Sequence, residues 1–219
     1  MTLMEELKRM PLIAILRGIT GEAADRTVEA LADGGIRFVE VTMNTDGACD
    51  MIAKWRRAYG GRLRIGAGTV LNVEEAKKAA AAGAEYFVCP HLDERVIEFA
   101  LSKGLAVFPG AMTPTEIVRA HACGATAVKI FPAASLGLSY IKELQGPLGH
   151  IPMIPTGGVT PDNVAQYFEA GAFAVGIGGR LANKERIAAG DFDSIRRTAA
   201  VFAAKVNELP LNSTSRSMR

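Results

Sequence analysis

The sequence has few of the features that mark secreted, membrane-bound or nucleic-acid-binding proteins. Its three cysteines (Cys49, Cys89 and Cys123) are odd in number, far apart and without a CxxC motif, which argues against a disulfide framework or a zinc site. No apolar run approaches the roughly 18–20 residues of a membrane span, and the charged, helix-like segment 1–9 lacks the apolar stretch of a signal peptide. A net charge of +2, with no long basic run, does not suggest nucleic acid as a partner. We therefore expect a cytoplasmic protein that binds neither nucleic acid nor a membrane.

Histidine is also scarce, and its spacing does not suggest a metal site. The three histidines (His91, His121 and His150) show no pattern such as HExxH, and no acidic residues cluster at the ends of the expected strands. A metal-dependent enzyme is therefore disfavoured, and we expect neither a metal nor a cofactor.

The chain does contain a regular alternation of short apolar runs and helical patterns. Strands are expected at 12–16, 37–42, 64–68, 85–89, 105–108, 126–130, 151–155 and 173–177. Helical periodicity marks 22–32, 73–82, 94–102 and 113–122. Eight strand–helix units, at spacings of about 20–27 residues, are typical of parallel βα folds. They predict a single (β/α)8 TIM barrel with an N-terminal helix over residues 1–206, rather than a doubly wound sheet. The polar residues 207–219 are expected to form a disordered tail.

An internal near-repeat supports this count. In segments 34–41, 82–88, 123–130 and 170–177, a glycine follows a helical pattern and an apolar strand begins at once. Glycine supplies the left-handed conformation that commonly ends a helix. In such a barrel the functional residues lie at the carboxyl ends of the strands.

Two charged residues lie inside expected strands, where branched apolar side chains normally pack. Alternation places Lys129 on the same strand face as Ala127 and Phe131, and places Glu40 opposite Val39 and Val41. Both charges should therefore point into the barrel near its top. They could form a buried ion pair that only satisfies itself. Alternatively, a desolvated lysine is a nucleophile, and a buried carboxylate of raised pKa can transfer protons beside it.

Other strand ends add binding groups. Arg17 ends the first strand and could hold a carboxylate through two hydrogen bonds, although a salt bridge at the rim would equally explain it. Thr69 follows the third strand and offers a hydroxyl. Paired glycines follow the last two strands, where barrels commonly bind phosphate through free N–H groups. These residues are Thr156, Gly157 and Gly158 after the seventh strand, and Gly178 and Gly179 after the eighth.

Taken in this order, the motifs resemble those of the 2-keto-3-deoxy-6-phosphogluconate and 2-keto-3-deoxy-6-phosphogalactonate aldolases. The matching segments are 11–18 (PLIAILRG), 39–42 (VEVT), 66–71 (GAGTVL), 128–132 (VKIFP) and 155–158 (PTGG). The resemblance implies a class I aldolase of sugar-acid degradation, of the Entner–Doudoroff or galactonate type. Such an enzyme reversibly cleaves the phosphorylated keto-deoxy acid to pyruvate and glyceraldehyde 3-phosphate.

The resemblance also implies roles for single residues. Lys129 matches the Schiff-base lysine, Glu40 the proton-transfer glutamate and Thr69 the threonine that binds the pyruvate carboxylate. Pro90 and Phe131 match residues that line the pocket. Members are typically homotrimers that need no metal.

The chain departs from the family pattern at two positions. Asn44 stands where some members carry an arginine that contacts the carboxylate, and Gly179 stands where some carry a serine in the phosphate loop. The first departure favours the galactonate branch, and we expect Arg17 to hold the carboxylate instead. The C4 configuration of the substrate and a side activity on 4-hydroxy-2-oxoglutarate stay open.

Alternatives to an aldolase also stay open at this point. Isomerases and thiamine-phosphate-synthase-like transferases use the same barrel with a glycine-rich phosphate site. A non-catalytic phosphosugar-binding relative would keep the glycine loops without needing both Lys129 and Glu40.

Overall fold

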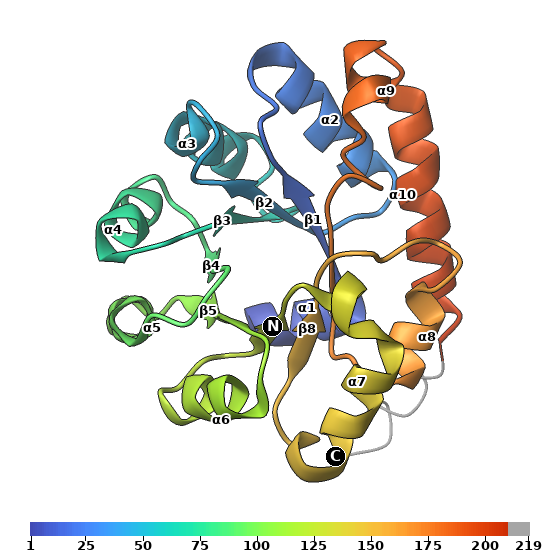
Figure 1. The fold of residues 1–219 in the computed structure, drawn as a ribbon. Helices are drawn as coiled ribbons and strands as arrows, with labels where there is room; N and C mark the ends of the chain where they lie inside the picture. The colour runs from blue at the N-terminus through green and yellow to red at the C-terminus, as the bar shows by residue number, and fades with distance from the viewer. Residues whose placement is uncertain (210–219) are drawn as a thin grey trace.

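The computed structural model describes residues 1–209, a layer of parallel strands surrounded by helices (Figure 1). The strands are β1 (Leu12–Leu16), β2 (Phe38–Thr42), β3 (Arg64–Gly68), β4 (Tyr86–Val88), β5 (Ala106–Phe108), β6 (Gly110–Ala111), β7 (Val128–Ile130), β8 (Met153–Pro155) and β9 (Val175–Ile177). The helices are α1 (Leu3–Arg9), α2 (Gly21–Asp33), α3 (Ala48–Ala58), α4 (Val73–Ala81), α5 (Glu94–Ser102), α6 (Pro114–Ala122), α7 (Ala133–Leu148), α8 (Val164–Glu169), α9 (Lys184–Ala188) and α10 (Phe192–Asn207). Residues 210–219 of the expected tail lie outside the described residues, and Asn207 still belongs to α10.

The strands form two sheets rather than the single eight-stranded sheet that the sequence predicts. The larger has the order β5-β4-β3-β2-β1-β9, and the smaller has the order β6-β7-β8; all pairings are parallel. The prediction of one closed sheet of eight strands therefore needs correction. The expected fifth strand, 105–108, corresponds to β5, and the unexpected short strand β6 follows it after Pro109. Proline has no N–H to donate to a ladder, so a strand is readily interrupted there.

Backbone contacts nevertheless connect the two sheets on both sides. Thr126 N donates to Val107 O at 3.1 Å, and Lys129 N donates to Pro109 O at 2.9 Å. On the other side, an isolated parallel bridge joins Thr156 to Gly176. On one side β5 thus lies next to β7, and on the other side β9 lies next to β8.

The predicted alternation of side chains is confirmed in β2. Val39 and Val41 belong to the large cluster between strands and helices, whereas Phe38 belongs to a separate cluster on the inner face. Tyr86, Phe108 and Ala127 share this inner cluster. The inner face is therefore a second apolar core, distinct from the layer that packs the helices.

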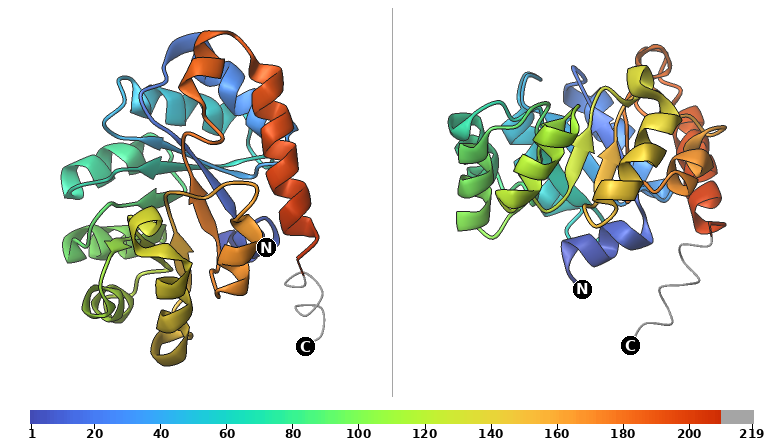
Figure 2. Two further views of the ribbon diagram at one scale, coloured as in Figure 1. Left: turned by 45° about the vertical axis from the view of Figure 1, so that its right-hand side comes forward. Right: turned by 60° about the horizontal axis from the view of Figure 1, so that its bottom comes forward.

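Helix α1 covers the end of the strands at which β1 begins (Figure 2, right). A capping box of Thr2 and Glu5 starts the helix, and Leu7 is fully buried in the inner cluster. Glu6 pairs with Arg64, the first residue of β3. Because α1 covers the amino ends of the strands, the carboxyl ends remain for a binding site.

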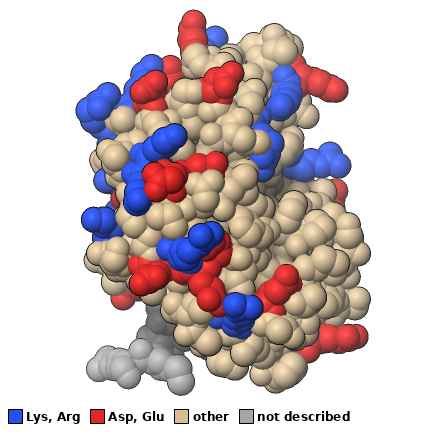
Figure 3. Space-filling view, turned by 60° about the vertical axis from the view of Figure 1, so that its left-hand side comes forward, with Lys and Arg blue, Asp and Glu red and all other residues tan. Residues whose placement is uncertain are grey.

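Charged side chains of both signs are interspersed over the face drawn in Figure 3. This mixture fits the near-balance of 25 basic and 23 acidic residues. Within residues 1–209, no helix combines the length and the apolar composition that crossing a membrane requires.

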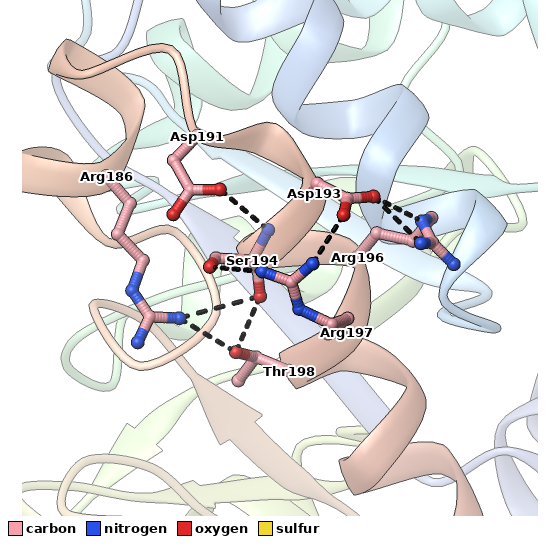
Figure 4. A network of polar contacts seen from close by, with 7 residues as sticks. All are labelled: Arg186, Asp191, Asp193, Ser194, Arg196, Arg197 and Thr198. Atoms are coloured by element: carbon pink, nitrogen blue, oxygen red, sulfur yellow. Dashed lines mark hydrogen bonds and ion pairs between the residues drawn. The ribbon is translucent and has the colours of Figure 1, made fainter.

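The last helix, α10, is fixed by a polar network at its start (Figure 4). Asp191 caps the helix by accepting from Ser194 N at 3.0 Å, and Asp193 pairs with Arg196 and Arg197. From α9, Arg186 donates to Thr198 Oγ1 at 3.1 Å. These contacts fix the start of α10 and join it to α9, while the main helix–helix contact of α10 is with α2.

Gly34 permits the close approach of α2 and α10, and we expect Gly34→Ala to destabilise the protein. A Cβ at this position would collide with the Cβ of Ala199 and lie 2.6 Å from the carbonyl oxygen of Arg196, a backbone atom that cannot move aside alone. Overpacking of this kind costs about 1–3 kcal/mol. Urea unfolding should therefore show a lower midpoint at an unchanged slope.

Gly146 provides the matched control because it lies in α7 and nothing would lie within 4 Å of an added Cβ. Because Pro147 follows and disfavours helical backbone for a residue with a Cβ, the gain in helix propensity is offset, and Gly146→Ala should change stability by less than about 1 kcal/mol. Equal midpoints for Gly34→Ala and the wild type would contradict the proposed close contact.

Candidate active site

A cavity of about 540 Å³ opens at the carboxyl ends of the strands. All residues predicted for the site except Glu40 line it: Arg17, Thr69, Pro90, Lys129, Phe131, Thr156, Gly157, Gly158, Gly178 and Gly179. These residues come from or directly follow β1, β3, β4, β7, β8 and β9. Parallel strands place all their carboxyl ends at one edge, which is why residues far apart in the chain meet here.

Lys129 is the titratable group at the base of this cavity. It lies in the middle of β7, only 5% of its surface is exposed, and its Nζ is 4.8 Å from the centre of the Phe131 ring. Burial lowers the pKa of Lys129; Glu40 and Cys89 oppose this shift, and Arg17 adds to it. A lysine of lowered pKa at a cavity wall can present a neutral, nucleophilic amine.

Glu40 lies beneath the cavity rather than in its wall. It is 1% exposed, and its Oε2 has no hydrogen-bond partner within the described residues. Burial raises the pKa of Glu40 to about 7, against a smaller lowering by Lys129 and Arg17. Within residues 1–209, no cationic side chain lies within 4.0 Å of this carboxylate. The two in-strand charges therefore do not form the closed ion pair that the sequence also allowed.

A glycine on the neighbouring strand makes room for the Glu40 carboxylate. Thr42 pairs with Gly68 across β2 and β3, and an added Cβ at Gly68 would collide with Oε1 of Glu40. Any larger residue at this position would displace the carboxylate or the strand. The motif GAGT in segment 66–69 thus provides space as well as the hydroxyl of Thr69.

Arg17 lies at one side of the cavity within a network of hydrogen bonds. Its Nη1 donates to Asn44 Oδ1 at 3.2 Å, and its Nη2 donates to Thr69 Oγ1 at 3.0 Å. The next residue is also held, because Gly18 N donates to Thr45 Oγ1 at 2.9 Å. The three residues that the sequence connected with a carboxylate (Arg17, Asn44 and Thr69) therefore lie together. The interpretation of Arg17 as a rim salt bridge does not hold, since its partners are uncharged.

The glycine loops occupy another part of the cavity wall. Gly157 and Gly158 have φ angles of +100° and +77°, a conformation that favours glycine. Within the described part of the chain, the N–H groups of Gly158, Gly178 and Gly179 have no backbone acceptor among the loop and turn hydrogen bonds. Unpaired N–H groups that converge on a cavity are suited to bind the oxygens of an anion.

The sequence interpretation missed two cations near these loops. Arg180 lines the main cavity directly after Gly179. Lys184 lines an adjoining cavity of about 430 Å³, which shares Arg17, Gly178 and Gly179 with the main one. A basic residue directly after a glycine pair was the available signal for Arg180. No sequence signal indicated Lys184, because the turn between β9 and α9 brings it near the glycine loops.

Other candidate sites are absent or remote. Within residues 1–209, no group of three His, Cys, Asp or Glu side chains is arranged to hold a metal ion. A further cavity of about 430 Å³ lies beside α1, lined by Glu6, Arg9, Arg37 and neighbouring residues. It contains none of the predicted site residues, so the carboxyl-end cavity is the candidate active site.

Comparison with known proteins agrees with this geometry. The family model described as KDPG and KHG aldolase matches residues 3–198. The 2-dehydro-3-deoxy-6-phosphogalactonate aldolase of Escherichia coli (strain K12) is 40% identical over 199 residues, which are 90% of this chain and 94% of the relative. A solved structure described as native KDPGal has a TM-score of 0.85 at 38% identity and covers 90% of this chain and 95% of its own.

A second solved structure bears on the chemistry. It is the KDPG aldolase of Legionella pneumophila, with pyruvate captured at low pH as a covalent carbinolamine intermediate. Its TM-score is 0.83 at 25% identity, over 92% of this chain and 98% of its own. Because the family model spans most of the chain and the Escherichia coli relative is similar over nearly its whole length, this protein belongs to the KDPG and KHG aldolase family.

Proposed function

We propose that this protein is a class I aldolase that reversibly cleaves 2-dehydro-3-deoxy-6-phosphogalactonate, 2-dehydro-3-deoxy-6-phosphogluconate or both. The products are pyruvate and glyceraldehyde 3-phosphate, which makes the enzyme a carbon–carbon lyase. The observation that carries the proposal is Lys129, a buried lysine of lowered pKa in the cavity wall, with the unpaired carboxylate of Glu40 beneath it. A non-catalytic sugar-binding protein would gain nothing from burying these two groups.

The proposed reaction starts with attack of the neutral Lys129 amine on the C2 carbonyl. Loss of water from the resulting carbinolamine gives an imine, and removal of the C4 hydroxyl proton breaks the C3–C4 bond. The aldehyde leaves, the enamine takes a proton at C3, and hydrolysis releases pyruvate. Glu40 carries these protons, because a pKa of about 7 allows it both to accept and to donate near neutral pH.

The binding groups are proposed to divide the substrate between them. Arg17 and Thr69 hold the carboxylate next to the reacting carbonyl, supported by Asn44. Gly157, Gly158, Gly178 and Gly179 bind the phosphate through their N–H groups, and Thr156 lies between the two ends. Pro90 and Phe131 form the apolar wall around Lys129.

The preferred C4 epimer is not determined by these contacts. Asn44 in place of an arginine favours the galactonate substrate, and the Escherichia coli relative bears that name. The deciding experiment is to assay both epimers with purified protein and to measure the release of pyruvate.

The architecture and assembly complete the proposal. We propose that the two sheets form one closed (β/α)8 domain over residues 1–206, supported by the hydrogen bonds from Thr126 and Lys129 on one side and by the Thr156–Gly176 bridge on the other. We also propose a cytoplasmic homotrimer. Free thiols at all three cysteines fit a reducing compartment, and the exposed side chains of Leu71, Met112 and Phe131 offer apolar area for subunit contact.

Trapping with borohydride should identify Lys129 as the Schiff-base residue. Reduction in the presence of pyruvate makes the imine permanent, and mass spectrometry of a digest locates the adduct. We expect the adduct on Lys129, and none after Lys129→Met. The exposed Lys142 on α7 serves as the control, since Lys142→Met should label like the wild type. An adduct on another lysine, or none in the wild type, would rule out the assignment.

Glu40→Gln should lower turnover and raise stability, and the second effect should depend on pH. Turnover should fall by about 10²–10⁴, the usual effect of losing a general acid–base. The pKa of Glu40 rises from 4.5 to about 7 on folding. The folded state therefore loses stability as the pH rises through this interval, by up to about 3 kcal/mol for a difference of about 2.5 pH units.

Removing the carboxyl group should recover part of this stability. Denaturation at pH 8 should show Glu40→Gln to be more stable than the wild type by about 1–3 kcal/mol, whereas at pH 4 the gain should vanish. Near-normal turnover would show that another group carries the protons. A gain that is equal at both pH values would refute the raised pKa.

Arg17→Ala should weaken pyruvate binding selectively. Charge-assisted hydrogen bonds are worth roughly 1.5–3 kcal/mol, so the dissociation constant of pyruvate should rise by about 10- to 150-fold. Affinity for glyceraldehyde 3-phosphate should change little, because the glycine N–H groups bind its phosphate. The two ligands should be titrated separately. A larger loss for the phosphate ligand would place Arg17 in the phosphate site instead.

A further inference from the structure

Three neighbouring strands place Glu40, Gly66 and Tyr86 at the same level of the inner face. Glu40 pairs directly with Gly66 across β2 and β3. Ala67 pairs with Phe87 across β3 and β4, so the preceding residues, Gly66 and Tyr86, also lie level with each other. The residue between Glu40 and Tyr86 therefore has no side chain to separate them.

The space over β3 is filled from both sides by these two residues. An added Cβ at Gly66 would collide with Cε2 and Cζ of Tyr86, and one at Gly68 would collide with Oε1 of Glu40. The ring carbon of Tyr86 that bears the hydroxyl thus lies over Gly66, and the carboxylate of Glu40 lies over Gly68. These two glycines are alternate residues of β3. The Phe38 and Phe108 rings, at 5.9 and 5.6 Å between ring centres, fix the Tyr86 ring in this position.

Glu40 Oε2 and Tyr86 OH are also the two buried side-chain polar atoms within residues 1–209 that have no hydrogen-bond partner. Buried polar atoms are nearly always paired, directly or through an ordered water molecule. Two unpaired atoms at one level of an otherwise apolar face have a simple common solution, which is to share one ordered water molecule.

We propose that Tyr86 is a positioning residue for Glu40, its hydroxyl donating to one ordered water molecule that in turn donates to the Glu40 carboxylate. This inference rests on the proposed aldolase function for its catalytic meaning. Tyr86 does not line the cavity, so it acts on the substrate only through Glu40. A hydrogen-bond donor at Oε2 would fix the orientation of the carboxylate plane and would leave Oε1 free to face the reacting groups.

The charged and titratable groups around Glu40 come from several elements. Lys129 on β7 and Arg17 after β1 lower its pKa, while burial raises it. Burial raises the pKa of the Tyr86 hydroxyl well above its ordinary value, and the charge of Glu40 adds to this shift. The charge of Glu40 also adds to the rise that burial causes in the pKa of Cys89, which follows β4. Tyr86 therefore stays protonated and acts as a donor throughout the working range of Glu40. A donor to the ionised carboxylate favours that form.

Tyr86→Phe tests the proposal because it removes the hydroxyl and keeps the ring. The readout is exchange of the pyruvate methyl protons with deuterated solvent, a half-reaction that needs Lys129 and a proton acceptor but no sugar phosphate. We expect the acidic limb of its pH profile to move upward by about 0.5–1 pH unit, which slows exchange about 3- to 10-fold below pH 7. The pyruvate concentration for half-maximal rate should not change, and Glu40→Gln should remove the effect of Tyr86→Phe.

A second readout needs no activity. Without its donor, ionised Glu40 is less favourable, so the unfolding equilibrium constant of Tyr86→Phe should exceed that of the wild type about 3- to 10-fold at pH 9 and match it at pH 5. Tyr167→Phe is the control, since Tyr167 is a buried tyrosine on α8 in the outer layer. It should change neither profile. Should Tyr86→Phe fold poorly, Tyr86→Leu repeats both measurements.

The outcomes separate this inference from the proposed function. An unchanged pH limb, or a stability change that is equal at pH 5 and pH 9, would show that Tyr86 only fills space and would overturn the proposal. A wild-type protein that exchanges no pyruvate protons and cleaves neither epimer would refute the aldolase function. In that case the pH dependence of unfolding still decides whether Tyr86 serves Glu40.

Discussion

Lys129 and Glu40 are buried on the inner face of the strands without forming an ion pair with each other, and the rest of the structure accommodates this arrangement. Burying a charge in an apolar environment costs several kcal/mol unless a partner compensates it. The cost is met by the outer core, where Val39, Val41 and their neighbours pack against the helices. Helix α1 contributes further stability, because its Leu7 covers the amino ends of the strands and its Glu6 pairs with Arg64. The scaffold can therefore hold two destabilising groups at its open end.

The same arrangement explains the composition of β3. This strand carries Gly66 and Gly68 toward the inner face, where barrels usually place branched side chains. Glycine weakens a strand, so its use at two alternate positions needs a reason. The reason is space, because the Tyr86 ring and the Glu40 carboxylate occupy the volume that two side chains of β3 would fill. The side chains of Glu40 on β2 and Tyr86 on β4 thus account for the two glycines of the strand between them.

Much of this site follows from the sequence because strand alternation is a local rule. The inward direction of Glu40 and Lys129 needs only the period of two, and the meeting of Arg17, Thr69 and the glycine loops needs only parallel strands. The division of the strands into two sheets at Pro109 was not predicted, since the apolar run ends there and Gly110–Ala111 is too short to recognise as a strand. Tyr86 escaped notice because a tyrosine in an apolar strand is most simply a core residue. Its unpaired hydroxyl is visible only in three dimensions.

The separation of Lys129 and Glu40 decides whether either could act in the proposed reaction. At ion-pair distance, attraction would hold the lysine protonated and the glutamate ionised, so that the amine could not attack and the carboxylate would be a weak base. Beyond that distance, burial becomes the largest influence on both groups: it lowers the pKa of Lys129 and raises that of Glu40 to about 7. Both shifts move the pKa values toward neutral pH, where proton transfer in either direction is least costly. The geometry that costs stability is therefore also the geometry that suits this pair of residues to the proposed chemistry.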